Sequence, residues 1–489
     1  MAKSIMLQGT MSNVGKSFLT AALCRIFRQD GCSVAPFKSQ NMALNSFITP
    51  DGAEIGRAQA LQAEAAGIKP SALMNPILLK PTTDVGSQLI VNGKVRGNMR
   101  AADYFRHKKE LIPDIMSAYS ELAKKNDIIV IEGAGSPVEL NLKADDIVNM
   151  GLAKLVKSPV LLVGDIDRGG VFAQLIGTLE LLENDERGMV KGLVVNKFRG
   201  DISLFQDGID ILRERSQKSV AGVVPYIDCD IEDEDSLSDK LSVRASDGDI
   251  DIAVIRLPKI SNFTDFDVFR QYSGVSVRYV SRASELGQPD LIILPGTKST
   301  IADTEWLNKC GLADAIKHSF SAGVPVFGIC GGYQMMGRTI SDPRGSEGGG
   351  SISGLGLLEC DTVFGTEKRQ TQVSGRFRDI QGFFSCLSGA ELYGYEVHMG
   401  ATKSSGTELT TCGGSFTESA AGCYVHGIFD SAEVSGRLVR ALYQRKGLTY
   451  TGTAIDRREY RENQLDLLAD SVRKSLDMEL IYRIIEVGV

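Results

Sequence analysis

The stretch Lys3 to Ser17 reads K-S-I-M-L-Q-G-T-M-S-N-V-G-K-S, and the fold of the first half of the chain follows from it. Ser4 to Leu7 are predicted to form a short buried strand, and the residues after Ser17 place apolar side chains at helical spacing. A glycine-bearing loop between a strand and a helix can hold a phosphate, because backbone N–H groups and the helix N-terminus face the anion. The stretch therefore predicts a nucleotide-binding loop, with a plain glycine turn as the alternative.

The end of this loop carries the side chains that phosphate chemistry requires. Gly15, Lys16 and Ser17 match the end of the pattern G-x-x-x-x-G-K-[ST], in which the lysine neutralises phosphate oxygens and the hydroxyl ligates Mg²⁺. The loop departs from the pattern at its first glycine, because Gly9 stands one residue early and Thr10 takes its place. With a lysine from a second loop, the candidate ATP- and phosphate-binding residues are Thr10, Asn13, Gly15, Lys16, Ser17 and Lys38.

Polar side chains follow two further predicted strands. Lys38 follows the strand Ser33 to Phe37, and Glu132 follows the apolar run Asp127 to Ile131. Both are expected beside the phosphate loop, because open α/β sheets bind ligands at the carboxyl ends of their strands. A carboxylate there can hold Mg²⁺ opposite the loop hydroxyl, although an isolated glutamate could equally cap a helix. Paired with the phosphate loop, Ser17 and Glu132 are the predicted Mg²⁺ ligands.

Length and composition limit the class of protein. At 489 residues the chain is too long for one hydrophobic core, and its 43% hydrophobic and 24% charged residues are typical of globular domains. The net charge of −7 argues against a nucleic-acid partner, and no apolar run is long enough to suggest a membrane span. Nine cysteines without paired spacing indicate free thiols, and we expect no signal peptide, so the cytoplasm is the predicted compartment. Nothing in the composition opposes assembly into an oligomer.

Predicted strands and helices alternate along both halves of the chain. This alternation predicts an α/β protein with two doubly wound three-layer α/β/α domains and mostly parallel sheets, the first P-loop NTPase-like and the second flavodoxin-like. The acidic, aliphatic-poor run Asp228 to Asp239 is expected at the boundary between them. The predicted divisions are residues 1–230, an acidic linker 231–250, residues 251–450 and a C-terminal helical extension 451–489 with an amphipathic pattern.

A second functional motif lies in the later half, where a predicted strand turns sharply into a helix. Residues 328–332 read G-I-C-G-G, a nucleophile elbow with Cys330 in place of serine. The flanking glycines permit the strained turn, and the helix N-terminus is expected to favour the thiolate. An oxyanion hole is expected from the N–H of Gly331 and an N–H of the Pro295-Gly296 loop. A buried structural cysteine is the alternative interpretation.

A nucleophilic thiol needs a base, and the chain offers four histidines. His426 ends an apolar strand at a glycine turn, so it can point along the sheet edge toward Cys330. His398 is the rival, and it is otherwise expected to be structural or to face the substrate. His107 lies in a basic helical patch of the first half, and His318 lies on a helix before the elbow strand. The sequence thus favours Cys330 as nucleophile and His426 as general base.

Longer strings carry a family resemblance. The elbow and its histidine resemble class I glutamine amidotransferases, in which a cysteine thiolate frees ammonia from glutamine, and G-T-M-S-N-V-G-K-S with I-E-G-A-G resembles dethiobiotin-synthetase-like P-loop enzymes. Together with K-S-Q-N-M-A-L-N-S, E-I-G-R-A-Q-A-L-Q-A, N-P-I-L-L-K-P, G-D-I-D-R-G-G-V-F-A and Y-E-V-H-M-G, they closely resemble the cobyric acid synthases of cobalamin biosynthesis. The resemblance implies that ATP activates side-chain carboxylates of a corrinoid, adenosylcobyrinic acid a,c-diamide. Ammonia from glutamine would then convert four of them into amides.

By this resemblance Cys330 is the nucleophile and His426 its base, with ATP, Mg²⁺, glutamine and a corrinoid as reactants and cofactors. Related glutaminases carry a carboxylate two residues after the histidine, whereas this chain has Ile428 there, which leaves the orientation of His426 to another group or to the backbone. Another glutamine-dependent ligase, such as cobyrinic acid a,c-diamide synthase or a nucleotide amidotransferase, stays open. So does a P-loop ATPase with an inactive glutaminase-like binding domain, although partitioning ATPases carry a lysine where this chain has Met11.

Overall fold

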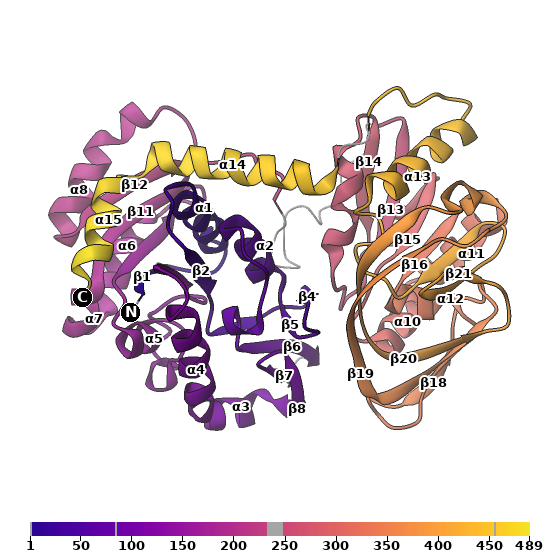
Figure 1. Ribbon diagram of the computed structural model, residues 1–489, viewed down its shortest axis with the longest axis horizontal. Coiled ribbons are helices and arrows are strands. Elements are labelled where there is room, and N and C mark those ends of the chain that lie inside the picture. Colours follow the sequence, from indigo (N-terminus) through magenta and orange to yellow (C-terminus); the bar gives the residue numbers. More distant parts are fainter. Residues whose placement is uncertain (1, 84–85, 232–247, 454–455) are drawn as a thin grey trace.

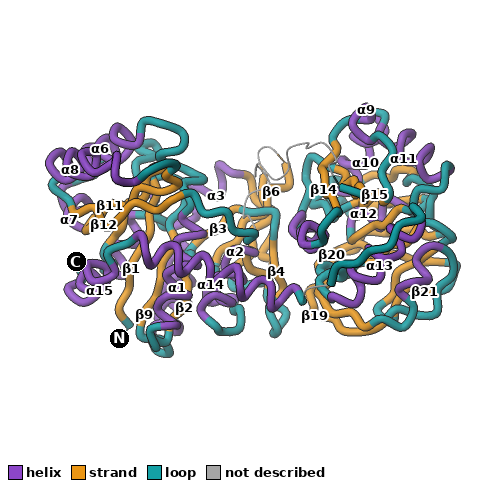
Figure 2. Tube along the Cα trace, turned by 90° about the horizontal axis from the view of Figure 1, so that it is seen from above, coloured by secondary structure: helices purple, strands orange, loops and turns teal. Residues whose placement is uncertain are grey.

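The computed structural model describes residues 2–83, 86–231, 248–453 and 456–489. It consists of two sheet-based lobes that lie side by side, with one long helix running from the second lobe back along the first (Figure 1). The view from above shows the same separation (Figure 2). Most of the expected acidic linker lies outside the described residues.

The first lobe is built on a parallel six-stranded sheet. Its strands are, in spatial order, β12 (Ser219–Pro225), β11 (Val190–Phe198), β10 (Val160–Asp165), β1 (Lys3–Gly9), β9 (Ile128–Glu132) and β2 (Val34–Phe37). Successive residues of β1 bury on opposite faces, with Ile5 and Leu7 in one apolar cluster and Met6 in another. A sheet that is apolar on both faces needs helices on both faces, which confirms the predicted three-layer α/β/α architecture.

Helices cover the two faces of this sheet. The helices of the lobe are α1 (Lys16–Gln29), α2 (Arg57–Ala66), α3 (Ala101–His107), α4 (Ile112–Ala123), α5 (Met150–Val156), α6 (Val171–Leu181), α7 (Asn184–Met189) and α8 (Gln206–Ser216). Leu19 and Leu23 of α1 belong to the cluster on one face, whereas Ile115 of α4 and Leu175 of α6 belong to the cluster on the other.

The second lobe has a seven-stranded sheet around a single apolar cluster. Its order is β14 (Val275–Val280), β13 (Ile250–Ile255), β15 (Leu291–Leu294), β16 (Val326–Ile329), β23 (Ala420–Cys423), β22 (Gly413–Phe416) and β21 (Glu408–Thr410). The pairs from β14 to β23 are parallel and the last two are antiparallel. The helical elements are η6 (Phe263–Gln271), α9 (Ala283–Leu286), α10 (Thr300–Lys309), α11 (Leu312–Ser321), α12 (Gly331–Met336) and α13 (Ala432–Arg445).

Each lobe also contains smaller sheets, which the sequence did not predict. One contains β3 (Gln40–Met42), β6 (Ile77–Thr83), β7 (Gly86–Val91) and β8 (Lys94–Arg100), and β4 (Ser46–Ile48) pairs with β5 (Glu54–Gly56). The second lobe contributes β17 (Thr339–Asp342), β18 (Gly350–Ser353), β19 (Cys360–Arg376) and β20 (Glu391–Ser404). Because β4 contacts both β19 and β20, these smaller sheets form part of the contact between the lobes.

The C-terminal residues return to the first lobe. The predicted amphipathic helix is two helices, α14 (Arg457–Ser475) and α15 (Met478–Val487), and the carboxylate of Asp477 caps the second by accepting the N–H of Leu480 at 2.9 Å. Leu465, Leu468 and Val472 of α14 are buried in the cluster that also contains α1. In the described part of the chain, no helix combines the length and the apolarity that crossing a bilayer requires.

Candidate active sites

The predicted elbow is a strained turn between β16 and α12. Cys330 has φ 51° and ψ −108°, and a positive φ is unusual for a residue with a side chain. Glycine is required beside it, since a Cβ on Gly332 would lie 1.9 Å from the carbonyl oxygen of Leu294. The turn therefore presents the thiol at the carboxyl end of the strand, as a nucleophile elbow does.

His426 is the histidine that the fold brings to Cys330. It follows β23, the neighbour of β16, and the two side chains line one cavity, in which the Cys330 thiol donates to the carbonyl oxygen of Val397 at 3.6 Å. Nδ1 of His426 lies 2.7 Å from Oδ2 of Asp265, and the N–H of Gly427 donates to the other carboxylate oxygen at 3.3 Å. The Tyr395 ring stacks on the imidazole. Cys330, His426 and Asp265 thus have the arrangement of a nucleophile, its base and the carboxylate that orients the base.

Burial and charge act in opposite directions on this histidine. His426 is 1% exposed, and burial lowers the pKa of its imidazole, but the charge and hydrogen bond of Asp265 and the hydrogen bond with Cys330 outweigh burial and raise the pKa to about 10. The protonated imidazole can therefore supply a proton to a leaving amine during the reaction.

Sequence reasoning did not identify Asp265. It lies in η6, far from His426 along the chain, whereas Ile428, at the position where related glutaminases carry a carboxylate, is buried in the apolar core. The sequence pattern that could have indicated Asp265 was a polar residue downstream of an apolar strand. Asp267 carries the same signal, but it lies 3.4 Å from Arg270, so the sequence could not separate the two.

The other histidines have different surroundings. His398 lines the same cavity as Cys330, with Nδ1 2.7 Å from the carbonyl oxygen of Gly400 and its ring stacked on Tyr424. His107 is exposed and lies 2.8 Å from Glu110. The expectation that His398 is structural or faces the substrate stays a prediction.

The two glycines predicted for the oxyanion hole lie close to the reactive groups. A Cβ on Gly296 would lie 2.8 Å from Cε1 of His426, and a Cβ on Gly331 would lie 3.0 Å from the backbone nitrogen of Thr297. The loop after β15 therefore closely approaches the elbow. Backbone N–H groups from both segments are candidates to bind one oxyanion, and this role stays a prediction.

A cavity of ≈ 40 Å³ opens at the elbow and has charged walls. Among the residues that line it are Lys80, Lys298, Cys330, Glu347, Lys368, His398 and His426. Burial lowers the pKa of Lys298 and raises the pKa of Glu347 to about 7, and the N–H of Thr300 donates to the Glu347 carboxylate at 2.7 Å. An ammonium and a carboxyl group in one cavity are complementary to the α-groups of a free amino acid.

The phosphate loop joins β1 to α1, as the sequence predicted. Asn13 and Gly15 take left-handed conformations, with φ 60° and 94°, which turn the backbone around the loop. The Lys16 ammonium donates to the carbonyl oxygens of Met11 at 3.1 Å and of Gly135 at 3.2 Å. Its charge therefore lies across the loop, between β1 and the segment after β9.

Glu132 is the centre of a buried network beside this loop. Its Oε1 accepts the Ser17 hydroxyl at 2.7 Å and the Lys38 ammonium at 2.9 Å, and its Oε2 accepts the Gln62 amide at 2.6 Å. Oxygen ligands from a hydroxyl and a carboxylate suit Mg²⁺, so the residues fit the predicted ion. Gln62 was missed, because an amide within the alanine-rich α2 gives no functional signal.

Neighbouring side chains brace the other edge of the loop. The Thr10 hydroxyl donates to Gln174 at 3.1 Å, and its N–H donates to the carbonyl oxygen of Val163 at 2.9 Å, so Thr10 already ties the loop to β10 and α6. The Asn196 amide donates to the carbonyl oxygen of Val14 at 2.7 Å. The strands β10 and β11 thus support the loop on the side opposite β9.

Hydrogen bonds join the second lobe to the first directly behind His426. The hydroxyl of Tyr395, whose ring stacks on that histidine, donates to the backbone carbonyl oxygen of Ser46 at 3.0 Å. The Asn262 amide donates to the same carbonyl at 3.1 Å and to the Tyr395 hydroxyl at 2.6 Å. The first lobe is therefore in contact with the residues that surround the base.

A buried ionic cluster lies at the same contact. Glu54 of the first lobe is fully buried, and its Oε1 lies 2.9 Å from the Lys80 ammonium, while Lys368 of the second lobe pairs with its other oxygen. Burial raises the pKa of Glu54, but the two lysines outweigh burial and lower the pKa overall. Because Lys80 and Lys368 also line the cavity at Cys330, the cluster forms one wall of that site.

Comparisons with known proteins agree with this two-centre arrangement. Residues 5–238 match the CobQ/CobB/MinD/ParA nucleotide binding domain, and residues 251–434 match the CobB/CobQ-like glutamine amidotransferase domain. The chain is 55% identical to a cobyric acid synthase of Lachnoclostridium phytofermentans, over 100% of both chains. It is 54% identical to that of Ruminiclostridium cellulolyticum, over 100% of this chain and 98% of the relative. The chain therefore belongs to the cobyric acid synthase family, whose members are glutamine amidotransferase ligases of cobalamin biosynthesis.

Proposed function

We propose that this protein is a cobyric acid synthase that uses ATP and glutamine to amidate four side-chain carboxylates of adenosylcobyrinic acid a,c-diamide. Each carboxylate would attack the γ-phosphorus of ATP, releasing ADP and forming an acyl phosphate. Ammonia would then attack the acyl carbon, lose a proton and expel inorganic phosphate. Activation is required because a free carboxylate offers no adequate leaving group.

The phosphate loop and the Glu132 network are the proposed ATP site. Lys16 and Lys38 would neutralise the charge of the transferred phosphoryl group, and Gly15 would let the backbone approach it. Ser17 and Glu132 would hold Mg²⁺, which when bound neutralises phosphate charge. The short Ser17–Glu132 contact of 2.7 Å supports this assignment, because it puts two oxygen ligands at one point.

Cys330 and His426 are the proposed glutaminase. The thiolate would attack the side-chain amide carbon of glutamine, His426 would protonate the leaving ammonia, and water would hydrolyse the thioester to glutamate. Lys298 and Glu347 would bind the α-carboxylate and α-ammonium of glutamine. The Asp265 contact with His426 at 2.7 Å is the single observation that carries this proposal, because an inactive binding domain has no need of an oriented base.

The contact between the lobes supports cooperation of the two sites. Lys80 belongs to the ATP-binding lobe but lines the cavity that contains Cys330. Ammonia released there would start next to the lobe that consumes it, which limits its loss to water. None of the nine cysteines, all within the described ranges, forms a disulfide bond, which supports the proposed cytoplasmic location.

Replacement of single residues separates the two chemistries. Cys330→Ala should abolish amidation driven by glutamine but retain amidation driven by free ammonia, whereas Lys16→Gln should abolish both. Products are counted by mass spectrometry after incubation with ATP, the corrinoid diamide and either nitrogen donor. Loss of both activities in Cys330→Ala, with the fold intact, would refute the division of labour between the sites.

A further inference from the structure

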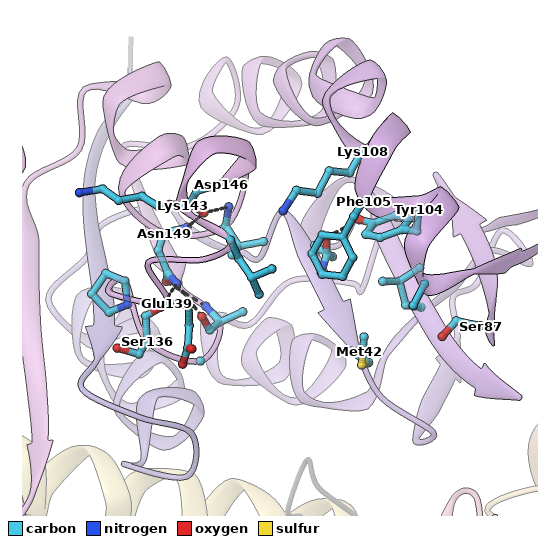
Figure 3. A pocket seen from close by; sticks show the side chains of 18 of the residues that line it. Met42, Ser87, Tyr104, Phe105, Lys108, Ser136, Glu139, Lys143, Asp146 and Asn149 are labelled. Carbon is cyan, nitrogen blue, oxygen red and sulfur yellow. Dashed lines mark hydrogen bonds between the residues drawn. The ribbon is translucent and has the colours of Figure 1, made fainter. Parts of the chain in front are cut away.

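One cavity of the first lobe has no role in the chemistry described above. It measures ≈ 270 Å³ and lies between the β3–β6–β7–β8 sheet, α3 and the segment after β9 (Figure 3). Three large apolar side chains that line it, Met42, Phe105 and Leu142, are 58%, 38% and 39% exposed. Apolar side chains that converge on an open cavity indicate a binding site for a ligand with apolar surface.

The Lys108 side chain faces this cavity. Lys108, directly after α3, points across the Phe105 ring, with its ammonium 4.8 Å from the ring centroid (Figure 3). The residue is only 7% exposed, yet its ammonium makes no hydrogen bond and no ion pair with any residue in the described ranges of the chain. Burial lowers the pKa of this ammonium. The Phe105 ring and the charges of Asp146 and Asp145 offset only part of the cost of enclosing this ammonium, and an anionic group of a ligand would offset more of it.

The two acidic side chains whose charges act on Lys108 are already engaged, and a third, the exposed Glu139, also lines the cavity. The Asp146 carboxylate accepts the N–H groups of Val148 at 2.8 Å and Gly151 at 2.8 Å, and Asp145 pairs with Lys109 at 2.9 Å. The ammonium of Lys143, which also lines the cavity, turns away from it toward Glu186 at 2.7 Å (Figure 3). Lys108 is therefore the cation that a ligand in the cavity would meet.

The cavity adjoins the phosphate loop. Its wall includes Gly135, whose carbonyl oxygen accepts the Lys16 ammonium at 3.2 Å. Asn149 fixes this wall, since its amide donates to the carbonyl oxygens of Ala134 at 2.6 Å and Ser136 at 3.1 Å. A molecule bound in the cavity would thus contact Gly135, and Gly135 contacts the lysine that is expected to hold the transferred phosphate.

We propose that this cavity binds the corrinoid substrate, with its apolar walls on an edge of the macrocycle and Lys108 on one peripheral carboxylate, while another carboxylate reaches the phosphate loop. The assignment rests on the proposed function. The assignment extends the proposed function because it gives the binding site of the corrinoid, a flat, largely apolar molecule with several carboxylates. The cavity lies on the β9 side of the phosphate loop. The base and sugar of ATP would then lie on the β10–β11 side, where Asn196 is located.

The test measures binding to the full-length protein by equilibrium dialysis, since corrinoids absorb visible light. The probe is cobyrinic acid a,c-diamide, and the comparison ligand is a corrinoid whose side chains are all amides. Lys108→Met should weaken the diamide about 10- to 100-fold, the range for a lost charge-assisted hydrogen bond, and the fully amidated corrinoid less than about threefold. Lys109→Met removes an exposed charge from the adjacent residue and should bind both ligands as the unaltered chain does.

A second variant distinguishes a blocked cavity from a change of fold. Ala101→Trp places a large ring at the exposed rim of the cavity and should block both corrinoids, with ATP affinity measured in parallel as evidence of an intact phosphate loop. Diamide binding that is unchanged in both Lys108→Met and Ala101→Trp would overturn the assignment and leave the proposed function standing. Loss of ATP affinity with normal corrinoid binding would overturn it in favour of a nucleotide pocket. If the unaltered protein binds no corrinoid, the proposed function falls with it.

Discussion

Replacing Asp265 by Asn tests the carboxylate that the fold supplies to the glutaminase base. Asn keeps the size of the side chain and one hydrogen bond to His426 but removes the negative charge. Burial, which lowers the pKa of the imidazole, would then act without the opposing charge at 2.7 Å. We expect the pKa of His426 to fall from about 10 and the alkaline limb of glutaminase activity to move to lower pH.

The size of the effect follows from the same pKa. A rise from 6.5 to about 10 corresponds to about 5 kcal/mol in favour of the protonated ring, at about 1.4 kcal/mol per pH unit. If all of this were expressed in the transition state, its loss would slow the reaction by a factor between about 10³ and 10⁴. Because Asn retains a hydrogen bond, we expect glutamine hydrolysis to slow about 10²- to 10³-fold.

Stability should change with pH in a defined direction. The folded-state pKa of about 10 exceeds the ordinary value of 6.5, so the stabilisation from the protonated ring is fully present below pH 6.5 and is lost as pH rises through 10. The difference in unfolding free energy between the unaltered chain and Asp265→Asn should therefore shrink over that window. Denaturant unfolding at several pH values measures it.

The assay compares ammonia release from glutamine across pH for Asp265→Asn and for a matched control, Asp267→Asn. Asp267 is also buried and also follows β13, but it pairs with Arg270 rather than His426. The control should leave the position of the alkaline limb unchanged. Equal rates and an unshifted limb in Asp265→Asn, with the protein folded, would show that Asp265 does not orient the base.

Two further predictions concern glutamine recognition and the C-terminal helices. Lys298→Met should raise KM for glutamine by about tenfold or more with a smaller change in kcat, because the proposed partner of the α-carboxylate is lost, and steady-state kinetics with glutamine and with free ammonia separate the two sites. Leu468→Ala should lower the free energy of unfolding by about 2–5 kcal/mol, since Leu468 is 1% exposed between α14 and the first sheet. Leu467→Ala, at a neighbouring position that is 46% exposed, should change it by less than about 0.5 kcal/mol in the same denaturant titration.

Local patterns in the sequence determined the α/β architecture and the central residues of two reactive sites. The phosphate loop and the elbow are each encoded within a few consecutive residues, because a glycine turn between a strand and a helix creates both sites without help from distant segments. The apolar run Ile128 to Ile131 likewise predicts a sheet covered on both faces, whatever lies next to it. Lys16, Ser17 and Cys330 could therefore be named in advance.

Tertiary structure alone decided which side chains complete these sites. Asp265 reaches His426, Gln62 reaches Glu132, and Lys80 of one lobe enters the cavity of the other, although no spacing rule links the members of any of these pairs. Helix α14 likewise joins the apolar core of the first lobe, although it follows the second lobe in sequence. The physical reason is that contacts between distant segments depend on how sheets and helices pack, and a single sequence records the period of each element but not the partner against which it packs.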